Sequence, residues 1–333
     1  MSQPILSIDG LKTAFHTFGG AVKAVDGVSC AVMEGEVLGV VGESGCGKSV
    51  LGFSIMGLVD LPGRVTDGRI MFNGSDLLEA RERDLRRIRG REIAMIFQDP
   101  MTALDPLFTI RHQMEEGLKL HGNLTRTQRR LRCIELLEEV GIPHPESRIN
   151  NYPHQFSGGM RQRVLIAIAL ASNPKLVIAD EPTTALDVTI QSQILRLLKR
   201  LVSDHNMSLM LITHDLAVVS EMADRIMVMY CGRVVENGPT RQIIDHPAHP
   251  YTRGLLDSIP KMRERQRTLN QITGSVPDVM NLPTGCAFAP RCTYATETCN
   301  TVAPQLVAGS TEHQIACHNP LDIHHKGPVA QPS

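Results

Sequence analysis

The sequence predicts an α/β fold built around a parallel sheet, because short apolar runs alternate along the chain with segments of helical periodicity. These runs are too short and too evenly apolar to be surface helices, which is typical of strands covered on both faces. A second observation is that a polar residue comes just after each run. The predicted strands are Val37–Val41, Ile93–Phe97, Leu176–Ala179 and Leu209–Ile212.

The polar residues that follow the predicted strands mark one edge of the sheet as a site. Lys48 lies in the loop after the first strand, and Gln98 follows the second. Asp180 and Glu181 end the third strand, and His214 follows the fourth. In an open parallel sheet, ligands bind outside the carboxyl ends of the strands. We therefore expect these five side chains to share one rim.

The loop after the first strand matches the phosphate-binding pattern G-x-x-x-x-G-K-[ST]. Its glycines let successive backbone N–H groups curl round an anion, and the helix that follows adds the pull of its positive end. The strand–loop–helix context disfavours the alternative of a glycine-rich turn with an incidental lysine. Lys48 is expected to reach the β- and γ-phosphates, and Ser49 to bind Mg²⁺. The residues assigned to this phosphate loop are Gly42, Ser44, Gly45, Cys46, Gly47, Lys48, Ser49 and Val50.

The acidic pair at the end of the third strand suits metal-assisted hydrolysis. A carboxylate at Asp180 can bind Mg²⁺ directly or through water. The next carboxylate, Glu181, can polarise an attacking water as general base. His214 is expected to contact the γ-phosphate. An isolated acidic pair or histidine would be an ordinary strand-end charge, but the shared rim favours the catalytic interpretation.

The segment between Gln98 and Ser157 has helical periodicity and is expected to form a helical insertion, at about residues 100–165. Within it, Thr125–Gln128 fits a capping box and Gly141 is a C-terminal stop. The mixed-charge run Arg81–Arg87 predicts a solvated helix face. Further on, Arg225–Gly238 predicts a hairpin.

Composition limits the possible classes of protein. The chain has 333 residues, of which 42% are hydrophobic, so it can bury a substantial core. A formal net charge of −1 gives no electrostatic footprint for nucleic acid. No apolar stretch reaches the roughly 18 residues of a membrane span, and the first residues do not begin a secretory signal. We expect a soluble or peripheral protein in the cytoplasm.

The composition changes after about Pro260, where the chain becomes rich in Pro, Thr and Asn, so a domain boundary is predicted there. His324–Ser333 is predicted to be a frayed tail. Four of the eight cysteines crowd into this part of the chain. Disulfides are disfavoured in the cytoplasm, so the cluster suggests a metal site, and the spacing alone leaves zinc and an iron–sulfur cluster near even. The four cysteines are Cys286, Cys292, Cys299 and Cys317.

The stretch FSGGMRQR, Phe156 to Arg163, resembles the signature motif of ABC transporters, with Met160 in place of the glutamine. The resemblance implies a P-loop NTPase (RecA-like) ATPase core with an antiparallel β subdomain, a helical insertion and a small Cys-rich C-terminal extension. It implies two ATP molecules sandwiched between this chain and a homologous partner. The resemblance also implies these residues and roles: Gln98 in the Q-loop, with a contact to Mg²⁺; Ser157, Gly158 and Gly159 in the signature; Asp187 in the D-loop; His214 as the switch histidine; and Phe15, with Phe18 as a competitor, stacking on adenine.

Four longer stretches resemble the ATPase subunits of dipeptide and oligopeptide importers, a family that also includes nickel importers. They are AMIFQDPMTALDP from Ala94, YPHQFSGGMRQR from Tyr152, IADEPTTALDVTIQ from Ile178 and HPYTRGLL from His249. The resemblance implies a distinct second ATPase subunit, two transmembrane permease subunits and an external solute-binding protein, with this chain peripheral on the cytoplasmic face of the inner membrane. It implies an ATPase domain over residues 1–260 and an extension over 261–333, and for the tail cysteines a [4Fe-4S] cluster, with zinc as the alternative.

Other functions stay open at this point. The chain could serve an importer of nickel or of an antimicrobial peptide, or an exporter, although the fused membrane spans common in exporters are missing. A non-transport ABC ATPase would need a long coiled-coil insertion or a second ATPase domain, and neither is present in the sequence.

The cysteine of the phosphate loop has two interpretations. Cys46 lies near Lys48 and a helix N-terminus, both of which lower the pKa of a thiol. The simpler interpretation, which we prefer, is that Cys46 fills a position for a small residue. Alkylation of Cys46 is expected to abolish ATP binding, and bound ATP to protect it.

Overall fold

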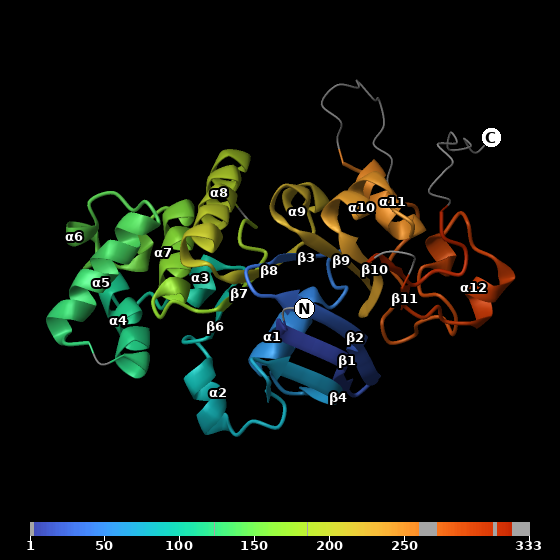
Figure 1. Cartoon of the computed structure of the whole chain (residues 1–333), viewed down its shortest axis with the longest axis horizontal. Helices are drawn as coiled ribbons and strands as arrows, with labels where there is room; N and C mark the ends of the chain where they lie inside the picture. The colour runs from blue at the N-terminus through green and yellow to red at the C-terminus, as the bar shows by residue number, and fades with distance from the viewer. Residues whose placement is uncertain (1–2, 123, 185, 260–271, 309–311, 322–333) are drawn as a thin grey trace.

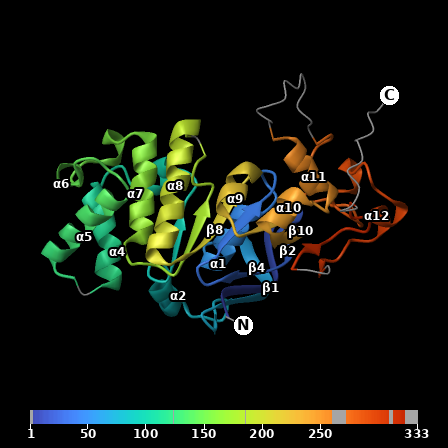
Figure 2. The same ribbon diagram turned by 45° about the horizontal axis from the view of Figure 1, so that its top comes forward.

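The computed structural model describes residues 3–122, 124–184, 186–259, 272–308 and 312–321. A long central sheet runs through this part of the chain, with a smaller antiparallel sheet packed below it (Figure 1). Helices gather at one end of the central sheet, and the C-terminal extension lies at the other (Figures 1 and 2).

The central sheet confirms the predicted α/β class. Its strand order is β11-β12-β10-β9-β3-β8-β7-β6, and the five strands from β9 to β6 are parallel. Every residue of β3, β7 and β8 is buried, as expected for strands covered on both faces. All four predicted strands are present. Their bounds are β3 Val37–Val41, β6 Ile93–Ile96, β7 Leu176–Asp180 and β8 Ser208–Thr213.

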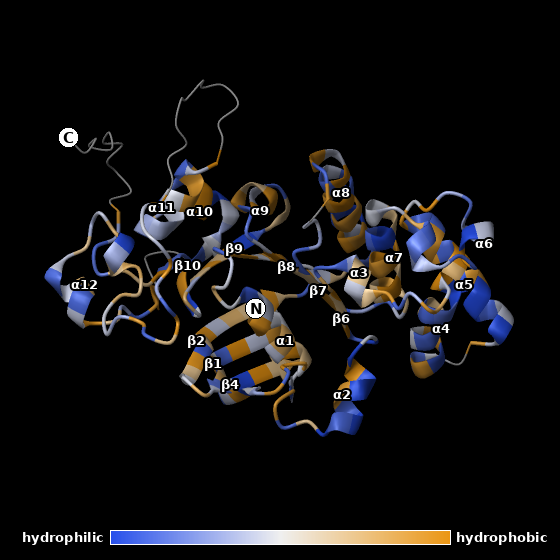
Figure 3. Cartoon of the chain, turned by 180° about the vertical axis from the view of Figure 1, so that it is seen from behind, coloured by the Kyte–Doolittle hydropathy of each residue, from blue (hydrophilic) through white to orange (hydrophobic). Residues whose placement is uncertain are grey.

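The antiparallel sheet is formed by the first part of the chain and confirms the subdomain that the family resemblance implied. Its order is β2-β1-β4-β5. Along these strands hydrophobic and hydrophilic bands alternate (Figure 3), because one face packs on the core and the other meets solvent. The bounds are β1 Pro4–Thr17, β2 Gly20–Met33, β4 Gly63–Phe72 and β5 Ser75–Asp76.

The helical end of the molecule contains the predicted capping box. The Thr125 hydroxyl accepts from Gln128 N at 3.4 Å, and Gln128 Oε1 accepts from Thr125 N at 2.9 Å. Just beyond the helix, Gly141 has φ +77°, as expected for a C-terminal stop. The elements here are α3 Pro100–Ala103, α4 Ile110–His121, α5 Arg126–Glu139, α6 Pro145–Arg148, η1 Pro153–Gln155, α7 Gly158–Leu170 and α8 Val188–His205.

Three further helices flank the sheets. α1, Lys48–Met56, lies between the antiparallel sheet and the central sheet (Figure 1) and buries six of its residues. α2, Glu82–Ile88, has no buried residue, which confirms the solvated face predicted for the mixed-charge run. α9, Leu216–Met222, packs against β3 and β8.

The C-terminal extension is joined to the central sheet by strand pairing. β9 and β10 form the predicted hairpin, and β12 adds to β10 with Glu236 opposite Ile315. The predicted boundary near residue 260 and the predicted tail from His324 lie outside the described residues. The elements are β9 Arg225–Tyr230, β10 Arg233–Pro239, α10 Thr240–Asp245, α11 Pro250–Asp257, η2 Ala289–Arg291, α12 Glu297–Thr301, β11 Val307–Ala308 and β12 Gln314–Ile315.

Candidate nucleotide-binding site

The phosphate loop joins β3 to α1, as the sequence predicts. Gly47 precedes the first residue of α1 with φ +98°, and a Cβ on it would lie 2.0 Å from the carbonyl oxygen of Ala24. Only glycine fits this position, because it needs both a left-handed backbone and free space. The buried Lys48 turns its Nζ back to the loop, where it donates to Gly42 O at 2.7 Å and to Glu43 O at 2.9 Å.

Next to the loop, a hydroxyl and a carboxylate meet. Ser49 Oγ donates to Asp180 Oδ1 at 2.9 Å. Burial raises the pKa of Asp180, and the nearby Glu181 raises it further, against the hydrogen bond from Ser49 and the charge of Lys48. Hydroxyl and carboxylate oxygens are the ligands that Mg²⁺ prefers. The pair therefore fits a magnesium ion at the end of β7.

The Glu181 carboxylate contacts side chains from two neighbouring strand ends and from its own turn. Its Oε2 accepts from Gln98 Nε2 at 3.0 Å and from Thr184 Oγ1 at 2.8 Å, and its Oε1 lies 3.3 Å from His214 Nδ1. Its backbone has φ +44°, an uncommon conformation for a residue with a side chain. Side chains from the ends of β6, β7 and β8 thus converge, which confirms the predicted shared rim.

Burial decides the chemistry of Cys46. Its side chain is 2% exposed, and its Sγ lies 3.7 Å from Lys48 Nζ. Desolvation raises the pKa of this thiol by more than the neighbouring Lys48 lowers it. The alternative interpretation, in which its neighbours give Cys46 a low pKa, is therefore wrong. The preferred interpretation, a small residue filling a packed position, agrees with its burial.

The remaining residues predicted around the nucleotide lie on or beside the loop and on the antiparallel sheet. Ser44 and Gly45 form the exposed tip of the loop, and Val50 is half-buried in α1. Phe15 is half-buried in β1 opposite Gly63, whereas Phe18 is fully exposed at the turn into β2.

The signature residues lie elsewhere. Ser157 precedes α7, and its hydroxyl accepts from Met160 N at 3.4 Å, so α7 begins with Gly158 and Gly159. Asp187 caps α8 in the same way, accepting from Ile190 N at 2.9 Å. In the part of the chain that the structure describes, no hydrogen bond joins these residues to the phosphate loop. α7 and α1 lie in different parts of the molecule (Figures 1 and 2).

The four C-terminal cysteines influence one another. Burial first, and then the charges of the other three thiols, raise the pKa of Cys317 to about 11. Burial and the neighbouring thiols Cys286 and Cys299 likewise raise the pKa of Cys292, against a backbone hydrogen bond. However, the described residues hold no group of three or more His, Cys, Asp or Glu side chains arranged to bind a metal ion.

The sequence did not predict two residues that contact the phosphate loop, Arg291 and Tyr251. Glu43 is paired with Arg291 at 2.6 Å, and its backbone N donates to the hydroxyl of Tyr251 at 2.8 Å. No local pattern links positions 248 residues apart. Thr184, which donates to Glu181, was also missed; it lies within a stretch that resembles the family, but no role was assigned to it there.

Among the helices described, none is long and apolar enough to cross a membrane.

Comparisons with known proteins agree with the geometry. Residues 25–184 match the family model described as ABC transporter, and residues 235–299 match the oligopeptide/dipeptide transporter C-terminal region. The dipeptide transport ATP-binding protein DppD of Escherichia coli is 50% identical over 318 residues, or 96% of this chain and 97% of the relative. The oligopeptide transport ATP-binding protein AppD of Bacillus subtilis is 51% identical over 314 residues, or 94% of this chain and 96% of the relative.

A solved structure is similar over the core. It is the ATP-binding cassette MJ0796, a dimer in a post-hydrolysis state bound to ADP and Pi, with a TM-score of 0.64 and 29% identity over 71% of this chain and 99% of that chain. The cassette fold, the identity to the relatives and the two family models agree. The chain belongs to the ABC-transporter family of ATP-binding proteins and carries the C-terminal region of the oligopeptide/dipeptide transporters.

Proposed function

We propose that the chain binds and hydrolyses ATP to power the import of dipeptides or oligopeptides across the cytoplasmic membrane. The observation that carries the hydrolytic part is the convergence of Gln98, Glu181 and His214 beside the Ser49–Asp180 pair. The peptide assignment is supported by the C-terminal family model and by the relatives' names, which include dipeptide and oligopeptide transport proteins.

The chain's own residues divide the chemistry. The N–H groups of the phosphate loop and Lys48 hold the β- and γ-phosphates. Ser49 and Asp180, with Gln98, hold Mg²⁺, which neutralises charge on the phosphates. Phe15 stacks on adenine.

Hydrolysis needs a base for the attacking water. Glu181 accepts the proton of that water. Hydrogen bonds from Gln98 and Thr184 fix the direction of its carboxylate, and His214 lies 3.3 Å from its other oxygen. His214 contacts the γ-phosphate and so senses whether it is present.

The signature residues serve the site of a partner. Ser157, Gly158 and Gly159 offer a hydroxyl, bare backbone N–H groups and the N-terminus of a 13-residue helix, all of which suit phosphate. Asp187 lies at the start of α8, next to this segment. The related cassette is described as a dimer. We propose a heterodimer with a second, homologous ATPase subunit, in which each chain's signature completes the other's site.

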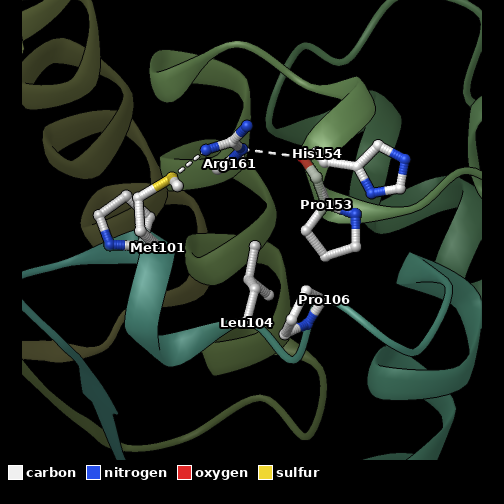
Figure 4. A pocket seen from close by; sticks show the side chains of 7 residues that line it. Met101, Leu104, Pro106, Pro153, His154 and Arg161 are labelled. Carbon is white, nitrogen blue, oxygen red and sulfur yellow. Dashed lines mark hydrogen bonds between the residues drawn. The ribbon is translucent and has the colours of Figure 1, made fainter.

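The surface near Gln98 is proposed to receive the permease subunits. Met101 and Leu107 are 61% and 79% exposed there and offer apolar contacts to a partner. A hollow beside them separates α3 from the start of α7 (Figure 4). Its lining residues are Pro100, Met101, Leu104, Pro106, Pro153, His154 and Arg161. The chain would then be peripheral on the cytoplasmic face of the membrane, with an external solute-binding protein delivering the peptide.

The C-terminal cysteines are proposed to hold a [4Fe-4S] cluster, with zinc as the alternative, in an extension over residues 261–333 that follows the ATPase domain of residues 1–260. Supporting this, the other three thiols lie close enough to raise the pKa of Cys317. Against it, the thiols are not arranged as a ligand set in the described residues. Iron, sulfide and zinc analysis of anaerobically purified protein, compared with Cys299→Ser, decides between them; a metal-free wild-type protein would contradict both.

The transport function is tested in the reconstituted complex. Purified chain, partner ATPase, permeases and binding protein are placed in vesicles, and ATP hydrolysis is measured with added solutes. We expect dipeptides or oligopeptides to stimulate hydrolysis and Ni²⁺ to have no effect. Stimulation by Ni²⁺ alone would contradict the peptide assignment and leave the ATPase assignment intact.

A further inference from the structure

A carboxylate inside the phosphate loop is paired with an arginine of the C-terminal extension. Arg291 Nη1 lies 2.6 Å from Glu43 Oε2, and Arg291 Nη2 lies 3.0 Å from Glu43 Oε1, which is a two-pronged contact. The Arg291 side chain is 4% exposed and that of Glu43 is 27% exposed. The pair is therefore shielded from solvent far better than a surface salt bridge, and screening by salt is weaker.

The guanidinium is held rigidly on its other sides. Arg291 donates to Tyr230 Oη at 3.3 Å and to Thr273 O at 3.2 Å. Its carbon Cζ lies 5.9 Å from the ring centre of Tyr230 and 6.0 Å from that of Phe288. These contacts fix the guanidinium before it meets Glu43, so little side-chain freedom is lost in the pairing.

The loop residue is also tied from a second element. Glu43 N donates to the hydroxyl of Tyr251 in α11, and the Tyr251 side chain is fully buried. The carbonyl of Glu43 in turn accepts from Lys48 Nζ at 2.9 Å. Glu43 thus connects Lys48, which is expected to bind phosphate, to α11 and to Arg291.

The charge of Glu43 is unusual for its place. A loop that binds a triphosphate gains from positive charge, and an uncompensated carboxylate within it would repel the ligand. Arg291 is the group that cancels this charge in the structure. Burying Arg291 next to the loop costs desolvation free energy, which offsets part of the stability that the ion pair adds to the fold. We therefore look for its effect in ATP binding as well as in folding.

We propose that Arg291 is a positioning residue for ATP binding: the C-terminal extension, through Arg291, neutralises Glu43 and fixes the backbone of the phosphate loop. The affinity for ATP then depends on the folded state of the extension. This inference rests on the role of the phosphate loop and is independent of the transported solute.

The first test measures the dissociation constant of ATP with the full chain by calorimetry. Arg291→Met should weaken binding about tenfold, because the Glu43 charge is left uncompensated in a poorly solvated position. In Glu43→Gln/Arg291→Met most of the affinity should return, since the repulsive charge is gone. Arg253→Met is the matched control, because it breaks an exposed pair with Asp257 on α11.

The double variant separates compensation from folding. If Arg291 only held the fold together, Glu43→Gln would not rescue Arg291→Met, and a double variant as weak as the single one would overturn the proposal. Unchanged ATP affinity in Arg291→Met would overturn it as well. Because binding rather than turnover is measured, neither outcome depends on the proposed base or on the solute.

A second test measures the accessibility of the phosphate loop in the absence of nucleotide. Cys46 is buried in the loop, while Cys30 and Cys133 are buried elsewhere, so the three thiols report local and global opening in one chain. Their alkylation rates are followed by peptide mass spectrometry. In Arg291→Met we expect faster labelling of Cys46 with unchanged rates at Cys30 and Cys133. A parallel rise at all three would contradict a loop-specific role.

Discussion

The phosphate loop and the signature segment are both built to meet phosphate, yet the chain treats them differently. Around the loop, polar groups are already joined within the chain, as in Ser49 to Asp180 and Gln98 to Glu181. At the signature, Ser157 and Gly158 are exposed, and the Ser157 hydroxyl only caps its own helix. One region is already joined within the chain, and the other is exposed, as the proposal of a partner at the signature requires.

Because of this difference, we expect substitutions in the two regions to affect different measurements. A change at the loop disturbs contacts inside the chain and should appear in the isolated protein. A change at the signature should leave folding and ATP binding by the isolated chain intact, and should appear only when a partner is present.

The largest effect is expected at Glu181, in the region that is joined within the chain. Glu181→Gln keeps an oxygen for Gln98 and Thr184 but removes the base, so turnover in the reconstituted transporter should fall about 10²- to 10⁴-fold. ATP affinity should stay near that of the wild type. Phosphate release and ATP binding are measured on the same preparation. Turnover within about tenfold of the wild type would point to another base.

Two glycines of the phosphate loop, Gly45 and Gly47, test whether close packing within the chain makes this loop sensitive to substitution. Gly47→Ala should cost more than the roughly 1–3 kcal/mol of its left-handed backbone, because its Cβ would lie 2.0 Å from Ala24 O. Gly45→Ala has φ +80° but no atom within 4 Å of its Cβ, so it carries the backbone strain alone. Denaturant unfolding measures both, and equal losses would show that the close contact carries no cost.

The equivalent change at the signature should be mild. A Cβ on Gly158 meets only Leu186 Cδ2, at an ordinary 3.7 Å, and alanine suits a helix. Gly158→Ala should therefore leave the free energy of unfolding within about 1 kcal/mol of the wild type. A larger loss would mean that the signature segment is packed within its own chain, against the contrast drawn above.

A smaller effect concerns acid. Burial lowers the pKa of His249 to about 4 from 6.5, and it lies between β10 and α11, behind the phosphate loop. Between pH 6.5 and about 4, His249 is therefore protonated in the unfolded chain but neutral in the folded protein. The contribution of His249 to stability is complete above pH 6.5 and falls as the pH drops toward 4, with a limit on the order of 3 kcal/mol.

His249→Asn tests this slope. The asparagine side chain offers an oxygen to Tyr251 N, which now donates to His249 Nδ1 at 3.0 Å, but it does not titrate. The variant should lose the part of the acid dependence between pH 6.5 and 4 in unfolding curves. If its curve keeps the wild-type slope, His249 is not the group responsible.

Local patterns predicted much of the fold and of the rim. Val37–Val41 was found because a fully buried parallel strand is apolar throughout, and α5 because Thr125 and Gln128 form a capping box. The rim followed from one rule about strand ends. The pairing of Glu43 with Arg291 could not be found, since it depends on how β9, α11 and the extension pack. The raised pKa of Cys46 could not be predicted for a related reason, because burial is invisible in a loop motif.

The most direct test of the two half-sites compares Ser157→Arg with Lys48→Ala. For each variant, ATP binding by the isolated chain and ATP-dependent association with the partner ATPase are measured. Lys48→Ala should lose both. Ser157→Arg should keep the wild-type affinity for ATP and lose only the association, because an arginine at the exposed start of α7 blocks the partner's nucleotide. Loss of ATP affinity in the isolated Ser157→Arg chain would contradict the assignment of the signature to a partner's site.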